Sequence, residues 1–382
     1  MGEVSENPWS VTASDLRAQL RACRDDGTAG ALVTVADVEG SAYRRPGTKM
    51  LVTDDGADAF GAVTAGCLED PVRELAADVI AADTPRVEVF DLMDDDGWGL
   101  GLGCNGIIDL LVEPLDASLD RALAGLADGE PVTLVTVLDG GVIGSRTLLT
   151  DDGSRRAVPD REPVPETALA DAADSIEQLH ATGKTRTVEA TADGRTVTLL
   201  VDSLQPVPEL LLFGSQNDLV PLASLAADIG LRVAVHSPRG AFDEGTVPAA
   251  DRVVTGHPSS LADTVTAPAH TYAVVMSHNL IDDRIAVQTL LQETSVPYVG
   301  LMGPRERFTD LREGLAEDGT PLTGTELDRL STPVGLDLGG GEPTEIALSI
   351  VSEVLAVSND REGGRLRDRT GPIHARVAQD SE

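Results

Sequence analysis

The chain has very little lysine and few aromatic residues. Only Lys49 and Lys184 are lysines among 29 Lys and Arg residues, and 64 Asp and Glu residues bring the formal net charge to −35. A field of this sign repels nucleic acids and anionic lipids over most of the surface. Aromatic residues are 3% of the chain, too few for a platform that stacks single-stranded nucleic acid. The composition therefore argues against a nucleic-acid partner, and a surface this acidic indicates adaptation to high salt.

Cysteine and long apolar runs are also scarce. The three cysteines, Cys23, Cys67 and Cys104, are too few for a disulfide framework in 382 residues. No apolar run approaches the length of about 20 residues that spans a bilayer. The N-terminus lacks a basic segment followed by an apolar one, so no secretory signal is expected. We expect no membrane span and a cytoplasmic, reducing location.

Hydrophobic residues make up 41% of the chain, enough for about two domains. The Pro-rich stretch 204–208 is the expected linker. Before it, residues 11–204 show irregularly mixed helix and strand patterns, typical of an α+β domain. After it, residues 205–357 alternate short apolar runs with helical patterns, which predicts a Rossmann-like, doubly wound parallel sheet. Residues 1–10 and 358–382 are polar or charged and are expected to be flexible.

Cys67 is the centre of the first candidate site. The pattern predicts a strand over 59–64 and a helix over 68–82, with Cys67 at the turn between them. Unpaired amides and the macrodipole at a helix N-terminus favour an anion and lower a thiol pKa, so Cys67 is a candidate nucleophile or metal ligand. Gly66 lets other atoms approach the backbone, and Glu69 is a candidate proton shuttle. The alternative is a buried, inert thiol.

Cys104 lies at the end of a second, glycine-rich loop. Glycines alternate with other residues from Gly99 to Gly103, which exposes many backbone amides to an anion or a bulky ligand. Cys67 and Cys104 are 37 residues apart with no histidine near them, which is not a zinc signature.

A basic cluster in the stretch Gly40–Met50 opposes the acidic background. It holds Arg44, Arg45 and Lys49. Arginine gives bidentate contacts to phosphate, so this loop is a candidate phosphate site. The alternative is that the arginines pair with surface carboxylates. Further along the chain, strands 131–138 and 142–150 are expected to form a β-hairpin.

The second half carries an incomplete dinucleotide fingerprint. Gly214 follows the first strand, but Gln216 stands where a second glycine would let a pyrophosphate approach. The second strand leads into Ser237 instead of the acidic residue that would hold a ribose. NAD(P) binding is therefore disfavoured. Beside Gly214, other candidates for ligand contact at strand ends and helix starts are His278, Asn279, Arg305 and Asp337.

Together these motifs resemble the XdhC/CoxI family of xanthine dehydrogenase accessory proteins, over about residues 12–357. The family elements are Gly-Ser…Arg-x-x-Gly-x-Lys-Met, Gly-Cys-x-Glu, Gly-x-Gly-Cys-x-Gly, strand-His-Asn, Gly-x-x-Gly-Pro-Arg and Gly-Leu-Asp-x-Gly. They correspond here to Gly40–Met50, Gly66–Glu69, Gly101–Gly106, Ser277–Asn279, Gly300–Arg305 and Gly335–Gly339.

The resemblance implies a maturation factor more than an enzyme with its own turnover. Such a factor binds the molybdenum cofactor (molybdopterin), assists its sulfuration and delivers it to a molybdenum hydroxylase apoenzyme. A cysteine desulfurase or sulfurtransferase would supply the sulfur, and the chain would form a homodimer. Cys67 is then the first-choice ligand, molybdenum contact or sulfur relay, and Cys104 the second. The implied cofactor-binding set is completed by Gly66, Gly103, Arg44, Arg45, Lys49, Gly214, His278, Asn279, Arg305 and Asp337.

Two other readings stay open. The Rossmann-like half alone is also typical of an NAD(P)-binding oxidoreductase. A scaffold that docks the hydroxylase and the sulfurtransferase, without binding the cofactor, is the third.

Overall fold

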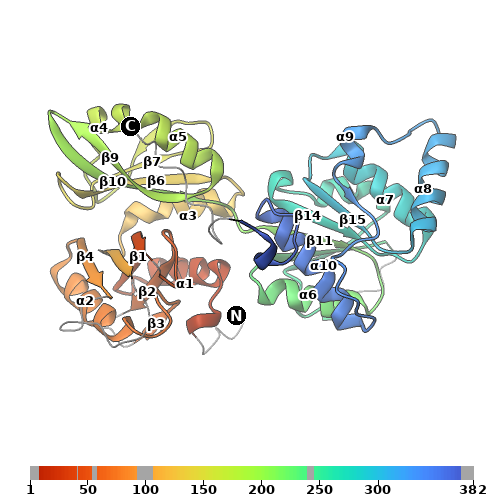
Figure 1. Ribbon diagram of the computed structural model, residues 1–382, viewed down its shortest axis with the longest axis horizontal. Coiled ribbons are helices and arrows are strands. Elements are labelled where there is room, and N and C mark those ends of the chain that lie inside the picture. The colour runs from red at the N-terminus through yellow and green to blue at the C-terminus, as the bar shows by residue number, and fades with distance from the viewer. Residues whose placement is uncertain (1–7, 41, 54–57, 93–105, 239–244, 371–382) are drawn as a thin grey trace. The chain divides into compact units, whose positions relative to one another are not determined.

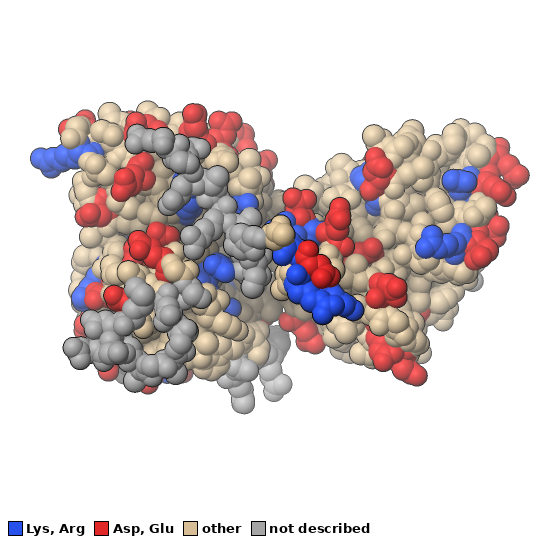
Figure 2. Space-filling model, viewed as in Figure 1, with Lys and Arg blue, Asp and Glu red and all other residues tan. Residues whose placement is uncertain are grey.

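The computed structural model describes residues 8–40, 42–53, 58–92, 106–238 and 245–370 (Figure 1). The chain forms two compact units, Met1–Val207 and Pro208–Glu382. In these described ranges, no helix is long and apolar enough to cross a membrane. On the face drawn in Figure 2, acidic side chains are scattered over both units. Of the termini expected to be flexible, the described parts include short 3-10 helices at Pro8–Ser10 and Leu366–Asp368.

The first unit begins with helix α1 (Ala13–Asp26) and an antiparallel five-stranded sheet. Thr12 and Asp15 form a capping box at the start of α1, and Gly27 ends it in the left-handed conformation. The sheet has the order β3-β2-β1-β5-β4. Its strands are β1 (Gly30–Gly40), β2 (Lys49–Thr53), β3 (Asp58–Phe60), β4 (Arg86–Asp91) and β5 (Gly106–Pro114). Helix α2 (Glu69–Ala82) packs its apolar face on this sheet.

A second antiparallel sheet completes the first unit, in the order β8-β7-β6-β10-β9. Its strands are β6 (Val132–Asp139), β7 (Arg146–Leu149), β8 (Arg155–Ala157), β9 (Thr185–Ala192) and β10 (Arg195–Leu204). The helices here are α3 (Asp120–Ala127), α4 (Glu166–Asp171) and α5 (Ala173–Thr182). Leucines of α1, β2, α3, β6 and β7 share one apolar core, so the two sheets belong to one packed body.

The second unit is a parallel six-stranded sheet in the order β13-β12-β11-β14-β15-β16. Its strands are β11 (Glu209–Phe213), β12 (Arg232–Ser237), β13 (Arg252–Thr255), β14 (Thr271–Val275), β15 (Tyr298–Leu301) and β16 (Leu330–Ser331). The helices are α6 (Leu219–Asp228), α7 (Leu280–Glu293), α8 (Arg305–Glu317), α9 (Gly324–Leu327) and α10 (Pro343–Ser358). Helices α6 and α10 pack with Leu210 and Leu212, whereas α7 and α8 pack with Leu211 and Phe213. Helices therefore cover both faces of the sheet, and the expected Rossmann-like, doubly wound fold is confirmed (Figure 1).

Several expected elements have different bounds. The strand expected over 59–64 ends at Phe60, because Gly61 has φ +83° and a Cβ there would lie 2.9 Å from the carbonyl oxygen of Lys49. The second hairpin strand begins at Arg146 instead of residue 142, because Val142 and Ile143 are exposed in the turn. Strand β8 and helix α9 were not predicted from the sequence.

Candidate functional site

Three of the sequence motifs open from one edge of the first sheet. Gly40 pairs with Gly106, Phe60 pairs with Leu51, and Asp91 pairs with Ile107. The ends of β1, β3 and β4 and the starts of β2 and β5 therefore point to the same end of the sheet, where Lys49 of β2 pairs with Thr34, six residues before Gly40 on β1. The basic loop and the Cys67 loop leave the sheet there. The segment with Gly103 and Cys104 lies outside the described residues; in the chain it follows β4 and precedes β5.

Cys67 is half-buried in the loop between β3 and α2, where it packs against the core of the first sheet. The expectation of unpaired amides around it was wrong. The hydroxyl oxygen of Thr64 accepts hydrogen bonds from the backbone amides of Gly66, Cys67 and Leu68 at 3.2–3.3 Å. The loop thus satisfies these donors by itself, so the amides do not form an empty anion site. The Cys67 thiol is therefore partly accessible, on a turn that these hydrogen bonds hold.

Glu69 is the second partner that holds this turn. Its carboxylate, 9% exposed, accepts from the hydroxyl and the amide of Thr64 at 2.8 and 3.2 Å and from the amide of Leu68 at 3.1 Å. Glu69 therefore positions the Cys67 loop. Gly66 has φ +117°, which other residues rarely adopt, and the ring of Trp9 lies 3.5 Å from where a Cβ would be.

The three cations of the basic loop have different surroundings. Lys49 Nζ lies 2.6 Å from Oδ2 of Asp202, a buried carboxylate, so Lys49 has an ion-pair partner within the unit. The guanidinium of Arg44 lies over the ring of Tyr43 at 5.3 Å, and its Nε is buried without a hydrogen bond among the described residues. Arg45 is exposed. Lys49 is thus committed to Asp202, whereas Arg44 and Arg45 form no ion pair with a described residue.

The second unit has its topological switch point between β11 and β14, where the strand order reverses. His278, after β14, has φ +59°, and its Nε2 lies 2.7 Å from a carboxylate oxygen of Asp218, after β11. Gly214 is also at this edge, but a Cβ there would lie 2.8 Å from the carbonyl oxygen of Met276. Gly214 is thus required by strand packing, whereas the His278–Asp218 pair faces solvent in part.

The remaining candidates of the second unit have differing roles. The side chain of Asn279 caps α7 by accepting from the amides of Ile281 and Asp282. Arg305, at the start of α8, and Asp337, before α10, are exposed. Arg307 on α8 pairs with buried Asp283 of α7, so that guanidinium is committed to the fold.

Sequence reasoning did not find Thr64, Asp218 or Asp202. Asp202 had a usable signal, because it is a carboxylate inside the apolar strand β10 and a buried charge needs a partner. Thr64 and Asp218 have no such signal, since their roles depend on loop geometry. In the part of the chain that the structure describes, no group of three or more His, Cys, Asp or Glu is arranged to hold a metal ion.

Known protein families match both units. The profile of the XdhC Rossmann domain matches residues 210–354, and that of the XdhC and CoxI family matches residues 23–91. The chain belongs to the XdhC and CoxI family. The XdhC and CoxI match includes the basic loop and the Cys67 loop, and the XdhC Rossmann match includes the switch point.

Relatives in this family extend over most of the chain. A Bacillus subtilis protein, named as a probable xanthine dehydrogenase subunit, is 29% identical over 348 residues, which are 89% of this chain and 97% of that protein. The Escherichia coli protein YqeB, named as uncharacterized, is 27% identical over 169 residues, 43% of this chain and 30% of that protein. A crystal structure described as a xanthine dehydrogenase from Bacillus halodurans has a TM-score of 0.70 at 25% identity and covers 90% of this chain and 96% of its own.

Proposed function

We propose that this XdhC-family chain is an accessory protein of a molybdenum hydroxylase of the xanthine dehydrogenase type, and that it carries the molybdenum cofactor as cargo. The observation that carries the proposal is the convergence of the basic loop, the Cys67 loop and the ends of the Cys104 segment at one sheet edge. The names of the B. subtilis and B. halodurans relatives support the link to xanthine dehydrogenase.

The chemistry of this edge fits such a cargo. The cofactor is an anionic pterin phosphate with two dithiolene sulfurs on molybdenum. Arg44, whose buried Nε has no hydrogen-bond acceptor among the described residues, and exposed Arg45 provide donors for the phosphate. The half-buried thiol of Cys67 is a soft donor suited to a metal–sulfur centre, as its ligand or as a sulfur relay. Cys104 is the second candidate thiol.

Glu69 serves this site indirectly. Because its carboxylate holds the Thr64 hydroxyl and the Leu68 amide, it fixes the position of the Cys67 loop. The proposal extends to three partners. A cysteine desulfurase or sulfurtransferase supplies sulfur, an apo-hydroxylase accepts the cargo, and a second copy of the chain forms a homodimer with the first.

The direct test is to purify the full chain from cells that make the cofactor. Bound pterin is measured by its fluorescence after oxidation, and molybdenum by mass spectrometry. Cys67→Ala should lower both at least tenfold. Cys23→Ala is the matched control, because Cys23 is buried on α1 away from this edge. A wild-type protein without pterin, or equal amounts in the wild type and Cys67→Ala, would contradict the proposal. Capture of the hydroxylase without any pterin would favour the scaffold instead.

A further inference from the structure

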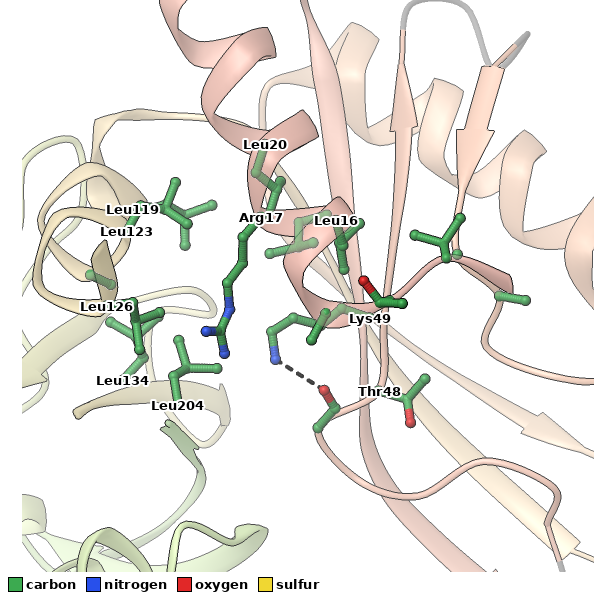
Figure 3. Close-up of a pocket in the computed structure, with 18 of the residues that line it drawn as sticks. Leu16, Arg17, Leu20, Thr48, Lys49, Leu119, Leu123, Leu126, Leu134 and Leu204 are labelled. Carbon is green, nitrogen blue, oxygen red and sulfur yellow. Dashed lines mark hydrogen bonds between the residues drawn. The ribbon is translucent and has the colours of Figure 1, made fainter. Parts of the chain in front are cut away.

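The first unit has a cavity, partly open to solvent, that the proposed function does not use fully (Figure 3). Its volume is about 250 Å³, and it lies among α1, the basic loop, α3 and the ends of β6 and β10. Eight leucines line it: Leu16, Leu20, Leu32, Leu119, Leu123, Leu126, Leu134 and Leu204. The charged residues of the lining are Arg17, Arg44 and Lys49, and no carboxylate is among them. The chain has 64 Asp and Glu residues, so a lining whose charged residues are all cations has the opposite charge to the protein as a whole.

Two of these cations have unused hydrogen-bond donors. Arg17 Nη2 donates to the carbonyl oxygen of Gln205 at 2.7 Å, but Arg17 Nη1 is buried without a partner among the described residues. Arg44 Nε is likewise buried without a hydrogen-bond partner among the described residues. Burial, and then the charge of Arg21, lower the pKa of Arg17, and Asp202 offsets this only in part. Buried donors are normally satisfied, so the unused ones point to an acceptor that enters from outside.

Figure 3 shows the guanidinium of Arg17 and the amine of Lys49 pointing into the same space, with leucines around them. Lys49 already pairs with Asp202 at 2.6 Å. The excess positive charge therefore comes from Arg17 and Arg44. An uncharged apolar ligand would leave these donors unmatched, and a small inorganic anion would leave the leucine walls unfilled.

We propose that this cavity binds an aliphatic anion, with its head group at Arg17 and Arg44 and its chain among the leucines. A carboxylate and a phosphate monoester share the chemistry that Arg17 and Arg44 recognise. A pterin does not fit these walls, since its ring carries many donors and acceptors that leucines cannot satisfy. The leucine-lined part of the cavity is thus a second site, which shares Arg44 with the proposed cargo site.

The volume sets the length of the chain. A water-sized group occupies about 30 Å³, so the cavity holds about eight such groups. Each buried methylene should raise the affinity about fourfold. We therefore expect the affinity to rise from butanoate to octanoate and to stop rising near decanoate, where the cavity is full.

The test is calorimetric titration of the full chain, purified from cells that cannot make the molybdenum cofactor. Octanoate and octyl phosphate should each bind with one site per chain, and the tighter of the two identifies the natural head group. 1-Octanol, acetate and inorganic phosphate should bind at least tenfold more weakly. Because no cofactor is present, this result is independent of the proposed cargo function.

Two variants locate the site. Arg17→Gln should weaken octanoate at least tenfold and leave 1-octanol unchanged, and Leu126→Phe should weaken both by filling the cavity. Arg121→Gln is the matched control, since Arg121 is exposed on α3, the helix whose other face lines the cavity. Thermal melting verifies that each variant is folded.

Four results would overturn the inference. The first is that octanoate does not bind, and the second is that octanoate and 1-octanol bind equally. The third is that a folded Leu126→Phe protein binds octanoate as tightly as the wild type does. Equal binding of inorganic phosphate and octyl phosphate would also overturn it, because the leucines would then contribute nothing.

Discussion

Arg146 on β7 and Glu113 on β5 form an ion pair that joins the two sheets of the first unit. Arg146 Nη2 lies 2.7 and 2.5 Å from the two carboxylate oxygens of Glu113, and the side chains are only 2% and 3% exposed. The guanidinium also donates to the hydroxyls of Thr136 and Ser118, each at 3.0 Å. Each nitrogen of the guanidinium and each oxygen of the carboxylate therefore has a hydrogen-bond partner, as a buried charge pair requires.

Removal of one partner should destabilise the first unit strongly. Glu113→Gln leaves Arg146 buried without a compensating charge, which costs about 3–5 kcal/mol. The double variant Glu113→Leu with Arg146→Met should lose much less, because it removes both charges. Urea unfolding at fixed high salt, monitored by circular dichroism, measures the free energy of unfolding of each variant. A Glu113→Gln protein as stable as the wild type would contradict the prediction.

His236 makes the second unit sensitive to acid. It is fully buried at the end of β12, with Nδ1 2.9 Å from the Thr264 hydroxyl and Nε2 3.1 Å from the Gly256 carbonyl oxygen. Burial lowers its pKa in the folded state. The unfolded chain takes up the proton first, near the ordinary value of about 6.5, so the stability from neutral His236 is complete above that pH and is lost below it.

We expect the free energy of unfolding to fall by about 1.4 kcal/mol per pH unit below 6.5 through this residue, until its folded pKa is reached. The comparison is between wild type and His236→Gln at pH 7.5 and 5.5. The common titration of surface carboxylates cancels in that difference. Parallel pH dependence in the two proteins would exclude His236 as the cause.

The two described thiols should differ in reactivity. Cys67 is half-buried in a loop, whereas Cys23 is buried on α1, and burial with the nearby Asp26 raises the pKa of the Cys23 thiol. Since the thiolate is the nucleophile, iodoacetamide at pH 8 should modify Cys67 at least tenfold faster than Cys23. Peptide mapping after short pulses measures both rates in one sample. Equal rates would show that the Cys67 loop is closed.

The fold was largely predictable, because its signals are local. Apolar runs that alternate with helical patterns after Pro208 can satisfy their backbone only as a parallel sheet with helices on both faces. Element ends were less predictable. The end of β3 at Phe60 depends on the close approach of Gly61 to Lys49, a contact between neighbouring strands. Helices α4 and α5 meet at Ala172, and no local signal in the sequence marks that division.

The candidate site was predictable only as residue types. The sequence separated Arg44 and Lys49 from the acidic background, but not the partner of Lys49, Asp202, which is 153 residues away. No feature of the sequence marks Arg17 as a candidate binding residue. Leu16 and Leu20 lie at helical spacing on the buried face of α1, but the cavity beside Arg17 depends on α3 and β10, which are distant in the chain.

The switch point of the second unit should not bind a dinucleotide. In place of a second glycine, Gln216 stands in the loop after β11, and the carboxylate of Asp218 lies at the same crevice beside His278. A pyrophosphate would meet this negative charge without the backbone cradle that normally holds it. Fluorescence titration with NADH and NADPH in molar salt should show no binding in the micromolar range. Saturable binding with turnover of a carbonyl substrate would favour an oxidoreductase.

Salt should not release the proposed cargo. With a net charge of −35, long-range repulsion opposes an anionic cofactor, so retention depends on short contacts. In molar salt the Debye length is only about 3 Å, which removes that repulsion and preserves contacts at hydrogen-bond distance. Pterin retention should therefore hold or rise between low and molar salt, opposite to binding on an open basic surface. Two arginine variants test whether the basic loop holds the cargo. Arg45→Ala should lower pterin retention at every salt concentration.

Arg156→Ala, which removes another exposed arginine of the same unit, is the control and should not lower pterin retention. Retention that falls steeply with salt in a protein with an unchanged circular dichroism spectrum, or equal retention in Arg45→Ala and the wild type, would remove the basic loop from the site.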